Sequence, residues 1–189
     1  MLRLTQEQLN RYSRQIVMEQ IGEAGQQKLL QARVLLVGAG GLGSPVAYYL
    51  AAAGIGELGL VDSDQVEVSN LQRQILHSTE RLGMLKAESA KLTLTSLNPD
   101  VKVTSYPVRA SADNITELIR PYDVVVNAVD NFATRYLVND TCVRLQKPLI
   151  EAGVMKFDGM VMVILPGRGP CYRCVLPLCK ALHNGNYAK

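Results

Sequence analysis

The sequence lacks the features that mark membrane, secreted or nucleic-acid-binding proteins. Its longest apolar run, around residues 46–55, is far shorter than the roughly 20 residues that a membrane-spanning helix needs. The N-terminal segment MLRLTQEQLN has no apolar signal core. The formal charge is only +3, and no basic block alternates with aromatic residues. We therefore expect a cytoplasmic protein that binds neither membranes nor nucleic acid.

Cysteine is scarce, and the chain has no internal repeat, low-complexity segment or flexible linker. With 189 residues, 48% of them hydrophobic, the sequence is long enough to bury one substantial core. Its four cysteines, two of them in a C-x-x-C, fit a reducing compartment and a metal half-site better than a disulfide framework. We predict one domain over 1–189, with an N-terminal helical arm over 1–30.

Glycine, in contrast, is concentrated in the stretch VLLVGAGGLGS at 34–44. The apolar run 34–37 predicts a buried strand that enters a tight turn. The glycines of this turn are Gly38, Gly40, Gly41 and Gly43. Ser44 and Pro45 are typical of a helix start, and the following run ends at Gly54. Such a loop lets backbone N–H groups and the positive end of a helix approach an anion, which suits a nucleotide phosphate.

Strand-like and helix-like segments alternate along the rest of the chain. Expected strands cover 58–61, 101–106, 123–129, 148–151 and 159–165. Expected helices are one or two within 4–30, followed by 80–97, 112–120 and 132–145. This alternation predicts an α/β fold: a doubly wound, mostly parallel, Rossmann-like sheet with helices on both faces. In open α/β sheets, ligands bind outside the carboxyl ends of the strands.

An acid after the second expected strand favours a dinucleotide site. Asp62 lies about twenty residues beyond the glycines, where an acid accepts hydrogen bonds from ribose hydroxyls. By themselves, the glycine loop and this acid favour a nicotinamide or flavin enzyme.

The segment after Asp62 argues for a triphosphate instead. It concentrates polar and charged side chains: Asp64, Asn70, Arg73, Gln74 and Lys86. Arginine and lysine neutralise phosphate oxygens, while asparagine and glutamine orient them. Arg73 and Lys86 are expected to be surface cations at the nucleotide site, and ordinary surface charge is the alternative interpretation.

Three other features have a structural interpretation, and the first of them also has a functional one. Asp130 follows the strand 123–129, where a nucleotide or its Mg²⁺ would lie, and the alternative is a helix N-cap. The segment RYSRQI at 11–16 is typical of a surface helix with solvated arginines. Cys142 is expected to be a small buried hydrophobe.

The segment PGRGPCYRC introduces a pair of thiols that can chelate one metal ion. Cys171 and Cys174 supply half of the ligands that a structural Zn²⁺ site usually has, and no second C-x-x-C follows. Cys179 and His183 would complete a compact C-x2-C-x4-C-x3-H site. A redox dithiol is another alternative, and the residues alone leave the choice open.

Together, these motifs resemble the ThiF, MoeB and HesA adenylyltransferases, which are related to the ubiquitin-activating enzymes. The matching segments, in the family's order, are RYSRQ, GAGGLGS, VDSDQVEVSNLQRQ, LGMLKAESA, NPD, AVDN and PCYRC. The resemblance implies an enzyme that uses Mg-ATP to adenylate a ubiquitin-like sulfur-carrier protein. The target is the C-terminal glycine carboxylate of a carrier ending in Gly-Gly, in thiamine or molybdopterin biosynthesis.

The resemblance also implies roles for individual residues. Nucleotide contacts would come from Gly38, Gly40, Gly41, Gly43, Asp62, Ser69, Asn70, Leu71, Gln72, Arg73, Lys86, Asp130 and Asn131. Charge stabilisation in catalysis would come from Arg14, Arg73, Lys86 and Asp130, since the nucleophile belongs to the carrier. Asp130 would face Mg²⁺ or the adenylate. Arg14 would reach the γ-phosphate of a neighbouring subunit's ATP, which implies a homodimer.

At its C-terminus the sequence departs from the family. Family members continue beyond the C-x-x-C to a loop that often holds a reactive cysteine and to a second C-x-x-C, whereas this sequence ends after VLPLCKALHNGNYAK. The resemblance therefore implies a Zn²⁺ half-site at Cys171 and Cys174 within an incomplete tail, 166–189, and gives Cys179 no role. The alternative functions are a truncated, non-catalytic remnant that binds a nucleotide or a partner, and an NAD-type oxidoreductase.

Overall fold

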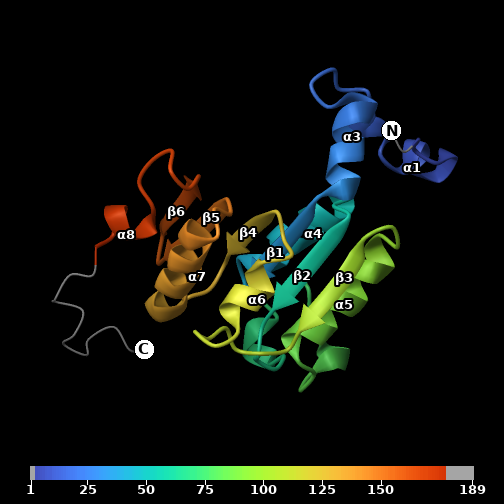
Figure 1. Ribbon diagram of the computed structural model, residues 1–189. Helices are drawn as coiled ribbons and strands as arrows, with labels where there is room; N and C mark the ends of the chain where they lie inside the picture. Colours follow the sequence, from blue (N-terminus) through green and yellow to red (C-terminus); the bar gives the residue numbers. More distant parts are fainter. Residues whose placement is uncertain (1–2, 178–189) are drawn as a thin grey trace.

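Strands and helices alternate along the chain, as the sequence predicts. The computed structural model describes residues 3–177 (Figure 1). The strands are β1 (Arg33–Val37), β2 (Glu57–Val61), β3 (Lys102–Tyr106), β4 (Val124–Asn127), β5 (Leu149–Met155) and β6 (Asp158–Ile164). The helices are α1 (Gln6–Arg11), α2 (Ser13–Ile16), α3 (Gly22–Gln31), α4 (Gly43–Ala53), α5 (Lys86–Leu97), α6 (Ile115–Ile119), α7 (Phe132–Arg144) and α8 (Tyr172–Val175), with short 3-10 helices η1 (Val68–Asn70) and η2 (Thr79–Arg81). Within 3–177, no helix combines the length and the apolar character needed to cross a membrane.

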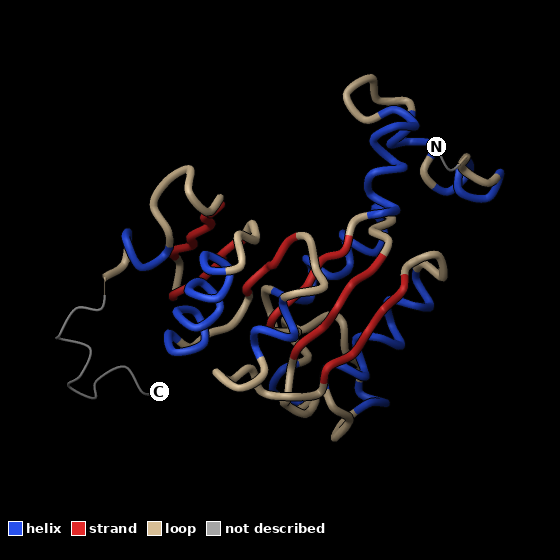
Figure 2. Tube along the Cα trace, viewed as in Figure 1, coloured by secondary structure: helices blue, strands red, loops and turns tan. Residues whose placement is uncertain are grey.

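The strands form one mostly parallel sheet (Figure 2). Their order is β3-β2-β1-β4-β5-β6. The strands β1 to β5 are parallel to their neighbours, and β6 runs antiparallel to β5 at the edge. The winding direction reverses between β1 and β4, and ligands of open α/β sheets bind at such a switch point. The predicted doubly wound fold is confirmed.

Helices cover both faces of the central strands. Because neighbouring residues of a strand point to opposite faces, Leu36 packs in a cluster with residues of α4 and α5, and Leu35 in a cluster with residues of α6 and α7. A strand buried on both faces is a continuous apolar run, which is what β1 shows. Cys142 of α7 is fully buried, and burial raises the pKa of its thiol to about 12. The expectation of a small buried hydrophobe at Cys142 is therefore confirmed.

Several helix boundaries differ from the predicted ones. The helix α5 begins at Lys86 rather than at residue 80, because η2 and a turn through Gly83, with φ of +81°, come first. The helix α4 begins at Gly43, so Ser44 lies inside it and caps nothing. The N-terminal arm contains three helices rather than one or two, since α1 ends at Arg11, Tyr12 caps it, and α2 starts at Ser13.

The hairpin of β5 and β6 is longer than the sequence predicts. The pairing extends from Leu149 opposite Ile164 to Met155 opposite Asp158, whereas the first of these strands was expected to end at residue 151. Beyond residue 151, β5 pairs with β6 and no longer with β4. One face of this hairpin is apolar and exposed, and we call it the hairpin face: Ala152, Val154, Val161 and Val163.

The N-terminal arm attaches to the end of α4 that lies away from the glycine loop. Tyr12 is buried, its hydroxyl accepts a hydrogen bond from Asn98 at 2.9 Å, and its ring packs against Gly54. A Cβ at Gly54 would lie 2.5 Å from that ring. Gln15 donates to the carbonyl oxygen of Ala53 at 3.2 Å. The arm is therefore anchored at the C-terminal end of α4.

Candidate active site

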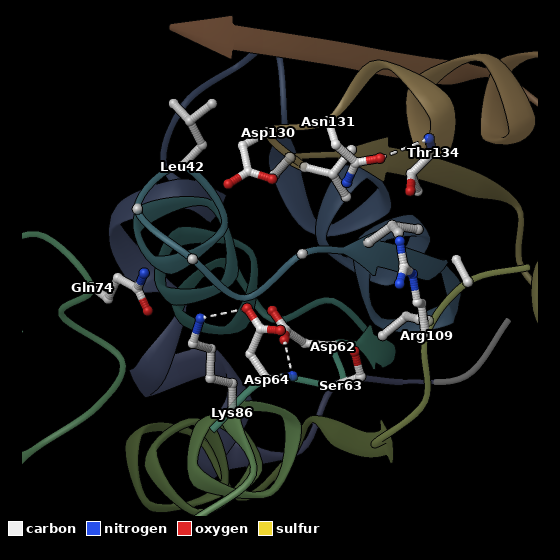
Figure 3. Close-up of a pocket in the computed structure, with 18 of the residues that line it drawn as sticks. Leu42, Asp62, Ser63, Asp64, Gln74, Lys86, Arg109, Asp130, Asn131 and Thr134 are labelled. Carbon is white, nitrogen blue, oxygen red and sulfur yellow. Dashed lines mark hydrogen bonds and ion pairs between the residues drawn. The ribbon is translucent and has the colours of Figure 1, made fainter. Parts of the chain in front are cut away.

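A cavity of about 700 Å³ lies at the carboxyl ends of β1, β2 and β4. Its walls include residues 38 and 40–42 of the glycine loop (residues 38–43), the segment 62–64 after β2 and the turn after β4. In Figure 3 the glycine loop passes between Asp130 on one side and Asp62 and Lys86 on the other. The switch point of the sheet therefore carries a cavity of the size that small-molecule ligands occupy.

The glycine loop approaches the neighbouring backbone too closely for side chains. A Cβ at Gly43 would lie 1.9 Å from the carbonyl oxygen of Gly38. Gly38 has φ of +96°, and a Cβ there would lie 3.0 Å from the carbonyl oxygen of Ala128. Gly40 and Gly41 line the cavity, and α4 begins two residues later, so the positive end of its dipole faces the same space. This arrangement suits a phosphate group.

Asp62 lies at the end of β2, as predicted, and holds the glycine loop. Its Oδ2 accepts the backbone N–H of Ala39 at 2.8 Å, and its Oδ1 accepts the backbone N–H of Asp64 at 2.9 Å. Burial raises the pKa of the Asp62 carboxyl, while these N–H groups and the charge of Lys86 oppose the rise. Each carboxylate oxygen still has a lone pair that can accept a ribose hydroxyl.

Lys86 is buried, so the expectation of a surface cation is wrong for this residue. It is the first residue of α5 and is 6% exposed. The segment at Asp64 lies against it, and both the backbone N–H and the Nζ of Lys86 donate to Asp64. Its Nζ lies 3.0 Å from Oδ2 of Asp64, whose side chain is 70% exposed. An ammonium has three N–H donors, and Asp64 is its one hydrogen-bond partner within residues 3–177. Two donors therefore remain for a phosphate.

Arg73 is an exposed cation, as expected, and it lines the cavity beside Gly41. Its Nη1 donates to the carbonyl oxygen of Ser69 at 3.3 Å. Gln74 also lines the cavity and is 4% exposed. Asn70 lines a smaller adjoining hollow together with Asp64 and Lys86.

The remaining predicted contacts of this turn lie outside the larger cavity. Ser69, Leu71 and Gln72 form the turn that carries Arg73, but none of the three lines the cavity. Gly43 shapes the glycine loop from within α4 and does not line the cavity either. These residues position the walls in this structure, and their direct nucleotide contacts stay predictions.

The turn after β4 separates two roles that the sequence left open for Asp130. The N-cap of α7 is Asn131, whose Oδ1 accepts the backbone N–H of Thr134 at 2.9 Å. Asp130 therefore does not cap the helix. Its exposed carboxylate has no hydrogen-bond or ion-pair partner within 3–177 and is directed at the glycine loop (Figure 3). It remains available for a ligand or a cation.

Arg14 does not reach the cavity of its own chain. It lies on α2, whose neighbouring Tyr12 and Gln15 contact the C-terminal end of α4. The 11 residues of α4 separate this end from the glycine loop, a length of about 16 Å at the rise of an α-helix. The role of Arg14 in a neighbouring subunit stays a prediction.

The cavity contains further residues that the sequence pattern did not single out: Ser63, Arg109, Thr134 and Arg135. Arg109 follows β3 and its side chain points into the cavity (Figure 3). The rule that selected Asp62 and Asp130, a position just beyond the carboxyl end of a strand, would also have found Arg109. Arg135 comes from within α7, and no local sequence signal marks it.

The thiols of Cys171 and Cys174 lie close together, at an Sγ–Sγ distance of 3.6 Å. Two sulfurs on a tetrahedral zinc are about 3.8 Å apart, given Zn–S bonds of about 2.3 Å. Burial raises the pKa of Cys171, but hydrogen bonds from the backbone of Cys174 and from Asn139 lower it overall. Within 3–177 no three His, Cys, Asp or Glu side chains are grouped to hold a metal ion. Cys179 and His183 lie outside the described residues, and the Zn²⁺ half-site stays a prediction.

His77 supports the glycine loop and does not line the cavity. Its Nε2 lies 3.0 Å from the carbonyl oxygen of Ala39, and its Nδ1 lies 3.0 Å from Oγ of Ser89. Since a carbonyl oxygen only accepts, Nε2 carries the proton and Nδ1 accepts from the Ser89 hydroxyl. Burial lowers the pKa of His77 below its usual range.

Because the pKa of His77 in the folded protein lies below the ordinary histidine pKa of 6.5, the folded protein should become less stable as the pH is lowered below about 6.5. The unfolded state binds the proton first as the pH falls. The free energy of unfolding therefore decreases over the pH range between the pKa of the unfolded state and the lower pKa of the folded state. Urea unfolding between pH 7.5 and about pH 5.5 measures this slope. His77→Gln should flatten it relative to the wild type, and an unchanged slope in this variant would contradict the assignment.

Comparison with known proteins identifies relatives of most of the chain. A model described as the ThiF family matches residues 12–184. The sulfur carrier protein adenylyltransferase of Thermus thermophilus is 53% identical over 181 residues, which cover 93% of this chain and 67% of the relative. The adenylyltransferase and sulfurtransferase MOCS3 of Drosophila persimilis is 51% identical over 176 residues, which cover 93% of this chain and 39% of the relative. The chain therefore spans about two thirds of one relative and less than half of the other.

Solved structures of a related protein share the fold. The crystal structure of E. coli MccB with ATP matches with a TM-score of 0.79 and 34% identity, covering 87% of this chain and 51% of that one. The structure of MccB with MccA-N7isoASN matches with a TM-score of 0.80, 34% identity and coverages of 87% and 50%.

Proposed function

The chain belongs to the ThiF family, and we propose that it uses Mg-ATP to adenylate the C-terminal glycine of a ubiquitin-like sulfur-carrier protein. One observation carries this proposal: the switch-point cavity combines a glycine-rich loop at a helix N-terminus with several basic side chains, Arg73 and Lys86 among them, and with acids on two different strand ends, Asp62 and Asp130. Relatives named sulfur carrier protein adenylyltransferase and MOCS3 support the type of substrate. Family membership also removes the support that the glycine loop alone gave to an NAD-type oxidoreductase.

The cavity residues fit ATP in a definite order. Gly41, Arg73 and Lys86 gather at the N-terminal end of α4 and fit the phosphates. Asp62 lies at the end of the neighbouring strand and fits the ribose hydroxyls. Apolar side chains line the remaining wall, where a base would be shielded from water: Val37, Val61, Val108, Ala110, Ala128 and Val129. The structure of MccB with ATP supports a nucleotide site in this fold.

The proposed reaction is a transfer of AMP to a carboxylate. A carboxylate oxygen of the carrier forms a bond to the α-phosphorus, the bond to the bridging oxygen of the β-phosphate breaks, and pyrophosphate leaves with the electron pair. Lys86 and Arg73 stabilise the negative charge on the phosphates, and a donor of this kind contributes about 3 kcal/mol to the barrier. Mg²⁺, when bound, would neutralise further phosphate charge, and the exposed carboxylate of Asp130 would hold it. Because the nucleophile comes from the carrier, this chain aligns the reactants and stabilises charge.

Replacing Lys86 with methionine should lower the rate of carrier-dependent ATP:pyrophosphate exchange by about a hundredfold, because the site loses a preorganised cation. Arg73→Ala should have an effect of similar size. Methionine keeps the apolar stem of a side chain that is only 6% exposed, so the fold should persist. Lys102→Met is the matched control: Lys102 also pairs with a carboxylate, Glu57 at 3.1 Å, but it is 71% exposed and does not line the cavity.

The exchange assay has to include carriers of thiamine and of molybdopterin biosynthesis, because the sequence motifs are shared by both. Equal exchange in wild type and Lys86→Met would contradict the role of Lys86. A wild-type chain that binds ATP but shows ATP:pyrophosphate exchange with neither carrier would contradict the proposed activity.

We also propose that Arg14 acts on the γ-phosphate in a neighbouring copy of the chain. The distance between α2 and the cavity within one chain, set by the length of α4, supports this. Mixing Arg14→Ala with Lys86→Met, each inactive alone, should then restore about a quarter of the wild-type exchange rate, since half of randomly formed dimers are mixed and each has one complete site. If Arg14 acts within its own chain, the mixture stays as inactive as either variant.

The hairpin face supports a protein partner, and it also favours the second candidate function, a non-catalytic protein that binds a partner. Its valines are largely exposed, with Val154 at 62%, Val161 at 73% and Val163 at 66%. Val154 also lines the cavity, so the hairpin face adjoins the nucleotide site. Exposed, contiguous apolar side chains mark interaction surfaces.

Replacing Val161 and Val163 together with threonine should raise the KM for the carrier about tenfold, because the hairpin face loses apolar contacts. The KM for ATP should stay within about twofold, since neither residue lines the cavity. Val175→Thr, at an exposed site on α8, is the matched control. If the chain is a non-catalytic binder, the double variant weakens partner binding in pull-down or titration while no variant shows exchange.

A further inference from the structure

A buried polar cluster lies directly beside the turn that carries Asp130. Its members come from three elements: Asn127 of β4, Arg135 of α7 and Glu151 of β5. They are 0%, 7% and 0% exposed, respectively. Arg135 lines the cavity as well. The reaction proposed above assigns none of the three a role.

Arg135 connects the end of β4 to β5. Its Nη2 donates to the carbonyl oxygen of Val129 at 2.6 Å, and its Nη1 donates to the carbonyl oxygen of Ala152 at 2.9 Å and to Oε1 of Glu151. The other carboxylate oxygen of Glu151 accepts from Nδ2 of Asn127 at 2.7 Å. The guanidinium is therefore fixed by several acceptors at once, which only the planar fork of an arginine allows.

Stability alone does not explain this cluster. Buried ion pairs contribute little net stability, because the cost of removing both charges from water offsets their attraction. Burial raises the pKa of Glu151, and the hydrogen bonds and charge of Asn127 and Arg135 oppose the rise. The pair is also close to neutral as a unit, so its field at a ligand in the cavity is small. What the cluster contributes to the site is position, because Arg135 fixes the carbonyl group of Val129.

Asp130 depends on its backbone for its position, because its carboxylate has no hydrogen-bond or ion-pair partner in the described part of the chain. On its N-terminal side, the backbone is held by the bond from Arg135 to Val129. On its C-terminal side, it is held by Asn131, which caps α7 and whose carbonyl oxygen accepts the N–H of Arg135 at 3.2 Å. Arg135 therefore contributes to both anchors.

We propose that Arg135, oriented by Glu151, is a positioning residue for Asp130 and so sets the affinity of the nucleotide site for Mg²⁺. The inference rests on the proposed function, in which Asp130 faces the cation. A lysine at 135 keeps the charge but cannot reach the Val129 carbonyl, the Ala152 carbonyl and Glu151 together. The turn after β4 would then lose one defined anchor while the rest of the cavity stays in place.

The test measures ATP binding to the full chain by calorimetry over a series of Mg²⁺ concentrations, in wild type and in Arg135→Lys, Glu151→Gln and Asp130→Asn. Loss of a residue that orients a metal ligand costs about tenfold in metal affinity, so Arg135→Lys and Glu151→Gln should raise the half-saturating Mg²⁺ concentration by about that factor. Asp130→Asn should raise it at least as much. The affinity for ATP without Mg²⁺ should stay within about twofold of wild type for Arg135→Lys and Glu151→Gln, because neither variant changes the charge of Asp130.

Val138→Ala is the control for a general loss of stability, because Val138 is a fully buried residue of α7 that does not line the cavity. It should lower the melting temperature without changing the Mg²⁺ dependence. The proposal is overturned if Arg135→Lys and Glu151→Gln behave like Val138→Ala, if Asp130→Asn leaves the Mg²⁺ dependence unchanged, or if Arg135→Lys raises only the KM for the carrier. A wild-type chain that binds Mg-ATP without exchange would contradict the proposed function and leave this binding result intact.

Discussion

The rest of the structure depends on one steric constraint, the close approach of the glycine loop to itself and to β4. The carbonyl oxygen of Gly38 occupies the place where a Cβ of Gly43 would lie, at 1.9 Å. Without that approach, α4 could not begin directly beyond β1, and its positive end would not face the cavity. Ala39 is held on both sides, because its N–H donates to Asp62 and its carbonyl oxygen accepts from His77. The acid that suits a ribose therefore also holds the glycine turn in shape.

The sheet brings together residues that are far apart in the sequence. Asp62, Arg109 and Asp130 each follow a different parallel strand, and the carboxyl ends of parallel strands meet at one edge. The central strands β1, β2 and β4 are largely apolar and buried, so they fix the spacing of the site. The hairpin of β5 and β6 is the exception. It leaves one face bare, and that face adjoins the cavity at Val154.

Sequence reasoning succeeded where a local pattern or a general rule decides the outcome. The buried strand and glycines of 34–44, Asp62 and Asp130 were all found in this way, and so was the doubly wound sheet. Predictions from the sequence were wrong where contacts between distant parts of the chain determine the structure. The burial of Lys86 follows from packing against the segment at Asp64, and the length of β5 follows from its pairing with β6. The cap of α7 went to Asn131 rather than to Asp130, although both types favour that position, because the turn after β4 directs Asp130 into the cavity. Nothing local marks Arg135, whose partners lie on other elements.

Two cations of the cavity, Lys86 and Arg73, are held in opposite ways, and this difference has a chemical consequence. Lys86 is buried at the start of α5, and its partner Asp64 is exposed, so the ammonium is fixed in place while its counter-ion is free to turn toward solvent. A fixed charge needs no reorganisation when negative charge develops on a ligand, which is the condition for strong electrostatic stabilisation. Arg73 is exposed, and among residues 3–177 its guanidinium makes one long hydrogen bond, to the carbonyl oxygen of Ser69. A long, weakly held side chain can follow a group that moves. Lys86 is therefore suited to stabilise charge at a fixed point in the cavity, and Arg73 is suited to accompany a group that changes position.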